Sequence, residues 1–141
     1  MVKDKLKKYQ ADALEVRQLR ERKEELEATL SGLRSPAMTG MPHGGSGGSA
    51  LEAAVQRLID LDWLYAAKVS ALLDELREIE RIIDGLDPVE RLLMRARYIE
   101  GQKWEQVCVT IGYSWQHTHR MHGRILQKLE AQAGEVSCER E

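Results

Sequence analysis

The chain has 141 residues, of which 43% are apolar and 31% charged, and its formal net charge is −2. This composition is too apolar for a wholly disordered protein and too charged for a membrane protein. Phenylalanine is absent and proline occurs three times, which favours long helices over a β-sandwich or barrel. Because no global basic excess indicates nucleic acid, evidence for it must come from a local cluster.

A first helix is expected from about Lys3 to Leu33, because apolar residues recur there mostly at spacings of three and four. This stripe consists of Leu6, Tyr9, Ala13, Val16, Leu19, Leu26, Leu30 and Leu33, and Lys23 interrupts it. The following segment, residues 35–49, holds two of the three prolines and five of the eleven glycines. We expect it to be a flexible connector without helix.

A second helix is expected over residues 51–86, where a seam alternates steps of four and three. The seam consists of Leu51, Val55, Leu58, Asp62, Tyr65, Val69, Leu72, Leu76, Ile79, Ile83 and Leu86. Residues 1–86 therefore predict a coiled-coil-like antiparallel hairpin. Apolar residues also lie off the seam, at Ile59, Leu61, Trp63, Leu64, Leu73 and Ile82. They indicate a further partner, either a second copy or the C-terminal module, and a monomeric bundle is the alternative.

A third block, residues 87–130, predicts three short helices. Asp87, Pro88 and Glu90 are typical of a helix start, and Gly101 of a left-handed helix end. The expected buried stripe of this first helix is Val89, Leu92, Leu93, Ala96 and Ile99. A second helix places Trp104, Val107, Cys108 and Ile111 inward, and the third places Thr118, Met121, His122, Ile125, Leu126 and Leu129 inward. Residues 131–141 are expected to form a flexible tail.

The second and third helices are joined through Gly112, Tyr113 and Ser114, which is typical of a helix-turn-helix. In that motif the second helix presents its N-terminal residues to the major groove. Residues 114–128 contain no acidic side chain. The candidate DNA contacts are Trp115, Gln116, His117, His119, Arg120, Arg124 and Lys128. The alternative for this face is an ordinary solvated helix surface. Trp115 would then pack against Tyr113 or the preceding helix. Arg95 and Arg97 are further candidates for phosphate contacts, and their alternative is ordinary surface charge.

Three segments, residues 98–107, 111–114 and 120–129, resemble small proteins of Gram-positive phages and prophages. That family combines a helical N-terminal half with a helix-turn-helix similar to region four of sigma factors, and it is related to ArpU- and RinA-like transcriptional regulators. The resemblance implies sequence-specific DNA binding near promoters and contact with host RNA polymerase. The chain departs from the family pattern at Lys103, at Thr118 and at residues 115–117, and the last of these departures concerns the DNA target.

Other chemistries have little support in the sequence. His119 and His122 are spaced so that they could share a metal, but His117 points elsewhere and the sequence has no Cys-x-x-Cys or second histidine pair, so we do not expect a zinc site. Cys108 is expected to be a small buried apolar residue, and Cys138 lies in the expected tail. No nucleophile–base arrangement or phosphate-binding loop is present, so we expect neither an enzyme nor a cofactor. No secretory or membrane-spanning segment is found, which predicts a location in the bacterial cytoplasm. The expected function is a DNA-binding regulator of phage transcription that assembles into homo-oligomers, and the alternative is a protein–protein adaptor that never contacts bases.

Overall fold

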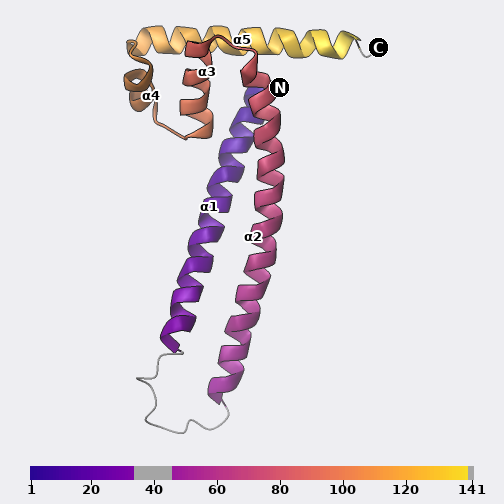
Figure 1. Ribbon diagram of the computed structural model, residues 1–141, viewed down its shortest axis with the longest axis vertical. Helices are drawn as coiled ribbons and strands as arrows, with labels where there is room; N and C mark the ends of the chain where they lie inside the picture. Colours follow the sequence, from indigo (N-terminus) through magenta and orange to yellow (C-terminus); the bar gives the residue numbers. More distant parts are fainter. Residues whose placement is uncertain (34–45, 140–141) are drawn as a thin grey trace. The chain divides into compact units, whose positions relative to one another are not determined.

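The computed structural model describes residues 1–33 and 46–139, and every element in these ranges is a helix (Figure 1). The elements are α1 (Val2–Leu33), α2 (Ser46–Asp84), α3 (Pro88–Met94), the π-helical turn η2 (Arg95–Ile99), α4 (Trp104–Ile111) and α5 (Trp115–Glu139). The described residues contain no strand, so the predicted all-α class is confirmed. None of these helices is apolar enough over a sufficient length to cross a bilayer.

The ends of two helices differ from the sequence expectations. The connector was expected to be free of helix through Ser49, but α2 begins at Ser46, so this expectation is wrong for residues 46–49. This segment contains two glycines, each of which costs about 1 kcal/mol in a helix relative to alanine. Extending the helix that begins at Ala50 is nevertheless easier than starting a new one, because the nucleus is already formed. The remainder of the predicted connector lies outside the described residues. The second difference is at the C-terminal end of α5, which continues past Leu129 to Glu139 and so includes most of the segment expected to be a flexible tail. Ala131, Gln132 and Ala133 favour this continuation because they are good helix formers.

The described chain divides into two compact units. Residues 1–12 and 72–141 form one, which we call the core unit, and residues 13–71 form the other, which we call the two-helix unit. The domain boundary that the sequence predicts at Asp87 falls inside the core unit. The first three turns of α1 therefore belong with the C-terminal helices rather than with the rest of α1.

The core unit is built around one cluster of buried apolar side chains, to which every helix contributes. The cluster consists of Val2, Leu6, Tyr9, Ile79, Ile83, Leu86, Leu93, Met94, Ala96, Tyr98, Val107, Ile125 and Leu129. The start of α1 also contacts the middle of α5 through a polar group, because the Val2 backbone N–H donates to Glu130 Oε1 at 2.7 Å. Glu130 thus accepts from an N–H at the start of α1 that has no partner within its own helix.

The buried side chains of the third block differ from the expectation both before and within the π-helical turn. Val89 and Leu92 were expected in the core but are exposed, whereas Met94 and Tyr98 are buried. Over η2 the Glu100 N–H donates to the Arg95 carbonyl, five residues back, at 2.8 Å. A turn of this width brings residues five apart onto one side. The helical period of 3.6 used for the sequence expectation therefore loses phase at Arg95.

In the two-helix unit, α1 and α2 are joined by half-buried apolar side chains and by ion pairs between charged side chains. Its segment of the predicted seam on α2 is half-buried, except for the exposed Asp62. Asp62 Oδ1 lies 2.8 Å from the Nζ of Lys23, so the two polar interruptions of the predicted stripes form an ion pair. A second pair joins Lys68 to Glu15 at 3.0 Å. Since higher numbers on α1 pair with lower numbers on α2, the two segments run in opposite directions.

Candidate nucleic-acid interface

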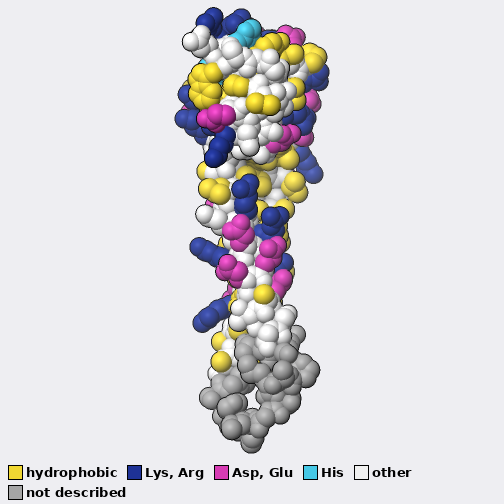
Figure 2. All heavy atoms as spheres, turned by 90° about the vertical axis from the view of Figure 1, so that its left-hand side faces the viewer, with side chains coloured by type: hydrophobic (Ala, Val, Ile, Leu, Met, Phe, Trp, Pro, Cys, Tyr) yellow, Lys and Arg dark blue, Asp and Glu magenta, His cyan; other side chains and the backbone are white. Residues whose placement is uncertain are grey.

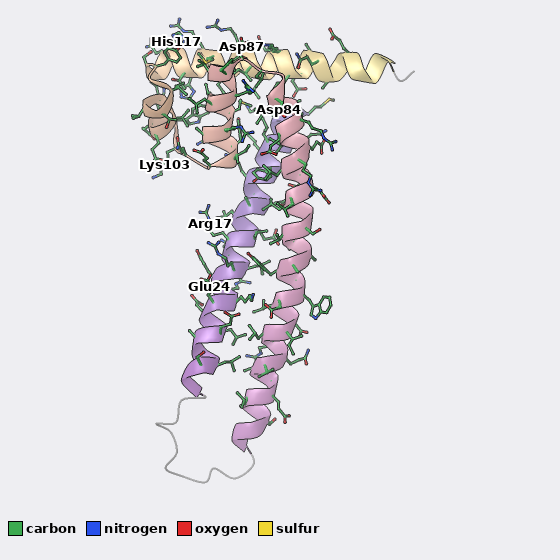
Figure 3. The ribbon with its side chains drawn as sticks, viewed as in Figure 1. Arg17, Glu24, Asp84, Asp87, Lys103 and His117 are labelled. Carbon is green, nitrogen blue, oxygen red and sulfur yellow. The ribbon has the colours of Figure 1, made fainter. Side chains whose placement is uncertain are left out.

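The junction between α4 and α5 is a tight turn stabilised from both sides. Gly112 follows α4 with a φ of 76°, the left-handed conformation that favours glycine. The backbone N–H groups of Gly112 and Tyr113 both donate to the Cys108 carbonyl, at 2.9 and 3.2 Å. On the other side, Ser114 Oγ accepts from the His117 N–H at 3.2 Å. The predicted roles of Gly112 and Ser114 are confirmed, and the turn fixes where α5 begins (Figure 3).

The starts of α3 and α4 are less well capped. Lys103 precedes α4 and its ammonium group has no acceptor, so it cannot cap the helix. Gln106 Oε1 does accept from the Lys103 N–H at 3.3 Å. Asp87 precedes α3 and Pro88 occupies its first turn, but the Asp87 carboxylate makes no capping hydrogen bond, contrary to the sequence expectation. Both starts rely on backbone geometry and neighbouring contacts more than on side-chain caps.

One side of α5 is anchored in the core. Thr118, Ile125 and Leu129 are buried at spacings of seven and four, as the sequence predicts. The Thr118 hydroxyl, unusual in the core, donates to the Ser114 carbonyl at 2.8 Å. Its polar group is therefore satisfied inside the core. These contacts fix the rotation of α5 about its own axis.

The opposite side of α5 is open to solvent along its first three turns. Gln116, Arg120, Gly123 and Gln127 are all exposed and lie at spacings of four, three and four, which places them on one line. A Cβ added at Gly123 would meet nothing within 4 Å. The glycine is therefore not required by internal packing, although a glycine inside a helix costs about 1 kcal/mol. Gln127 and Gly123 were not among the predicted site residues, although their helical spacing from Gln116 could have revealed them.

The basic candidate residues differ in how strongly they are engaged. Arg120 is exposed and makes no ion pair with any described residue. Arg124 and Lys128 are exposed beside Glu90, with Lys128 Nζ 3.8 Å from its Oε1. Arg95 and Arg97 are half-buried and turned to the protein itself. Arg95 lies 3.7 Å from Glu80, whereas Arg97 donates to the Gln102 carbonyl at 3.0 Å and stacks over Trp104.

Aromatic rings hold the start of α5 against α4. The His119 ring lies between two tryptophans, with centroids 4.5 Å from Trp104 and 4.4 Å from Trp115. Its Nε2 is buried and has no hydrogen-bond partner among the described residues. Trp115 itself keeps 48% of its surface exposed. His119 is thus inside a cluster of tilted rings rather than on the open line, while Trp115 forms the outer edge of that cluster.

The other two histidines of α5 also contact aromatic residues. His117 is exposed, and its ring stacks on Tyr113 at 4.5 Å. His122 Nε2 lies 2.7 Å from the Tyr98 hydroxyl, a hydrogen bond that joins α5 to η2. Burial lowers the pKa of His122 to about 4, with smaller contributions from neighbouring positive charge. His122 is therefore neutral at pH 7 and belongs to the core rather than to the interface.

The surface around this helix combines basic, aromatic and apolar side chains. Figure 2 shows, in the part that carries α4 and the start of α5, Lys and Arg side chains beside hydrophobic ones. Among the latter, Val109 on α4 is 83% exposed, and Tyr113 and Trp115 are also exposed. A shallow hollow of about 440 Å³ runs beside the basic residues and is lined by His117, Met121, Arg124, Lys128 and Glu90 among others.

No family model, curated protein or solved structure matches this chain.

Proposed function

We propose that this protein binds double-stranded DNA through the N-terminal half of α5 and regulates transcription, in the manner that its resemblance to phage regulators implies. In this proposal α4, the turn at Gly112 and α5 act as a helix-turn-helix, with α5 as the recognition helix. The observation that carries the proposal is the open line Gln116, Arg120, Gly123 and Gln127. It lies opposite the anchored side of α5 and contains no acidic residue.

The residue types on and beside this line suit base recognition. A glutamine can bind adenine through two hydrogen bonds and an arginine can bind guanine in the same way. Gln116 and Arg120 lie one turn apart, so they would contact neighbouring base pairs. Gly123 lets a flat surface approach the helix backbone closely. Arg124 and Lys128, at the edge of the line, are placed to contact phosphates.

Two predicted contacts take other roles in this proposal. His119 is a positioning residue, because its ring lies between Trp104 and Trp115 and its Nε2 is buried. His117 stacks on Tyr113 and is placed to reach a phosphate or a base edge. Trp115 is exposed enough to contact a thymine methyl group. The cluster of rings packs the first turn of α5 against α4, and such ordering before binding favours specific over non-specific binding.

The weak local charge favours binding as a pair of chains. Few basic residues lie on the interface, so one copy makes few phosphate contacts and has low non-specific affinity. We propose that the chain self-associates through its N-terminal helices and binds DNA as a homo-oligomer. Contact with RNA polymerase, which the resemblance also implies, would add affinity at a promoter.

The competing proposal is a protein–protein adaptor that does not contact bases. The observation that favours it is the exposed apolar surface on α3 and α4, where Val89, Leu92 and Val109 are open to solvent. An adaptor would use this surface rather than the polar line of α5. The two proposals therefore predict sensitivity to different substitutions.

The experiment that separates them starts with selection of bound fragments from a random duplex library. Affinity for the selected duplex is then measured over a range of salt concentrations. A DNA-binding protein gives an affinity that falls steeply with salt, with a slope of about −0.9 for each phosphate contact. Arg120→Ala and Gln116→Ala are each expected to reduce affinity about 10-fold or more and to relax sequence preference.

Arg17→Ala is the matched control, because it removes the same charge from an exposed position on α1 (Figure 3). This control is expected to leave affinity and sequence preference unchanged. Equal losses for Arg17→Ala and Arg120→Ala would indicate a non-specific charge effect. Failure to select any duplex at low salt would favour the adaptor proposal.

A further inference from the structure

One face of α2 in the two-helix unit has no cover among the described residues. Trp63 is 75% exposed and Ile59 is 43% exposed. Ala66 and Ser70 are exposed on the same line, at spacings of four, three and four from Ile59. This line, which we call the second seam, contains no charged side chain. A tryptophan exposed to this extent in an uncharged line is typical of a protein–protein contact.

The second seam repeats the heptad spacing of the first. The first seam in this unit, Leu58, Asp62, Tyr65 and Val69, faces α1, as the Lys23–Asp62 pair shows. At 100° per residue the second seam lies about a quarter turn away from it. A helix with two heptad seams about a quarter turn apart has two helical neighbours, as in a four-helix bundle. Among the described residues of the two-helix unit, α1 supplies one of these neighbours and no segment supplies the other.

We propose that the second seam is covered by the same seam of a second copy, in antiparallel orientation. This inference rests on the self-association proposed above and names its interface. The pattern of side-chain sizes supports it, because large residues stand opposite small ones when the two seams are paired by heptad positions a and d. Trp63 then faces Ala66 of the second copy, and Ile59 faces Ser70. Such a contact is symmetric, as a two-fold dimer requires.

Charges along α2 favour the antiparallel over the parallel arrangement. The heptad positions of the second seam can be continued along α2 in both directions. In the antiparallel pairing they place Glu52 of one copy opposite Arg77 of the other. A parallel pair would instead place the two glutamates together and the two arginines together. Repulsion between these like charges disfavours the parallel pair, whereas attraction between Glu52 and Arg77 favours the antiparallel one.

The size of the contact predicts a reversible dimer. The uncharged centre of the contact, from Ile59 to Ser70, spans about 18 Å of helix, and Glu52 and Arg77 lie beyond its two ends. One helix face of this length buries less than the roughly 800 Å² per partner of a standard stable interface. The dimer is therefore expected to dissociate on dilution.

Sedimentation equilibrium of the full chain at several concentrations tests the interface. Trp63→Glu is expected to weaken dimerisation by at least about 30-fold, because central interface tryptophans are typical hot spots. Leu64→Glu is the matched control: Leu64 is exposed to a similar extent as Ile59 but lies on a different side of α2. Circular dichroism confirms that both variants remain helical. A wild-type chain that is monomeric at all concentrations, or a Trp63→Glu chain that still dimerises, overturns the proposal.

Cysteine crosslinking tests the orientation in a background carrying Cys108→Ala and Cys138→Ser. A mixture of Ile59→Cys and Ser70→Cys chains is expected to form a mixed disulfide under mild oxidation, whereas neither variant alone does so efficiently. Efficient crosslinking of Ile59→Cys to itself would show a parallel pair and overturn the antiparallel arrangement. DNA binding is tested separately, by comparing the affinity of Arg120→Ala with that of the wild type. Failure of the dimer proposal and failure of the DNA-binding proposal can therefore be distinguished.

Discussion

In the core unit, buried side chains from every helix meet in one cluster, whereas the two-helix unit buries only Leu19 and Leu30 among its described residues. The core unit joins residues from both ends of the described chain, and its buried polar groups Thr118 and Tyr98 have partners. The two-helix unit instead combines half-buried apolar side chains with exposed ion pairs. A helix pair has too little interior to cover every apolar side chain, so α2 leaves Ile59 and Trp63 open. From this difference we expect the core unit to be the more stable of the two, and the two-helix unit to carry the proposed self-association.

The largest expected effect concerns the core unit. Leu93 is fully buried, so Leu93→Ala removes apolar contacts and leaves a cavity, and it should lower the free energy of unfolding by about 3 kcal/mol. Urea denaturation followed by circular dichroism measures this change. Leu19→Ala in the two-helix unit should cost less, because two helices can close over the gap more easily. Equal costs would contradict the contrast between the units.

A pH-dependent effect is also expected in the core unit. Burial holds the pKa of His122 at about 4, below its ordinary value of 6.5, so between these values the unfolded chain binds more protons than the folded one. Stability from this group is therefore complete above pH 6.5 and is lost as pH falls toward 4. Allowing for solvent screening, the loss should be about 2 kcal/mol.

The variant His122→Gln isolates this effect, because glutamine does not titrate and can keep a hydrogen bond to Tyr98. The difference in unfolding free energy between wild type and variant should shrink as pH falls from 6.5 to 4. Carboxylates titrate in the same range, but they contribute equally to both proteins. A difference that stays constant with pH would show that His122 is not held neutral by the fold.

Two glycines of α5 offer a matched pair that separates stability from binding. Gly123 lies on the open line and Gly134 lies beyond it, and a Cβ at either meets open space. Gly123→Gln and Gly134→Gln should each raise the free energy of unfolding by about 0.5 kcal/mol, because glutamine is the better helix former. Only Gly123→Gln should weaken binding to a selected duplex. If both variants bind equally well, the open line is not the DNA-contacting surface.

Much of the helical framework could be predicted from the sequence, because periodicity and local capping signals determine it. The seams, the left-handed Gly112 and the cap at Ser114 all depend on residues close together in the chain. The burial of Met94 and Tyr98 was not predicted, because it depends on how α3 and η2 pack against the other helices of the core unit. The contact of His119 with Trp104 and that of Glu130 with Val2 depend on residues far apart in sequence, and no local pattern indicates them. The contact of His119 with Trp115, by contrast, follows from their spacing of four on one helix. In the candidate site, residue types could be predicted but not which side chains are open.

The smallest expected effect concerns the pair that joins α1 to α2 in the two-helix unit. Lys23 and Asp62 each interrupt an apolar stripe, and the contact with Asp62 raises the pKa of Lys23. Because the Asp62 side chain is about half exposed, a double-mutant cycle with Lys23→Ala and Asp62→Ala should give a coupling of only roughly 0.3 kcal/mol, reduced further by 1 M salt. The pair's larger role is to fix the register, since two polar groups in apolar stripes are satisfied only when they face each other. Replacing both by leucine should therefore raise stability while permitting alternative registers, which crosslinking between cysteines placed on the two helices would detect. A coupling above about 1.5 kcal/mol would show that ion pairing, rather than apolar contact, stabilises this unit.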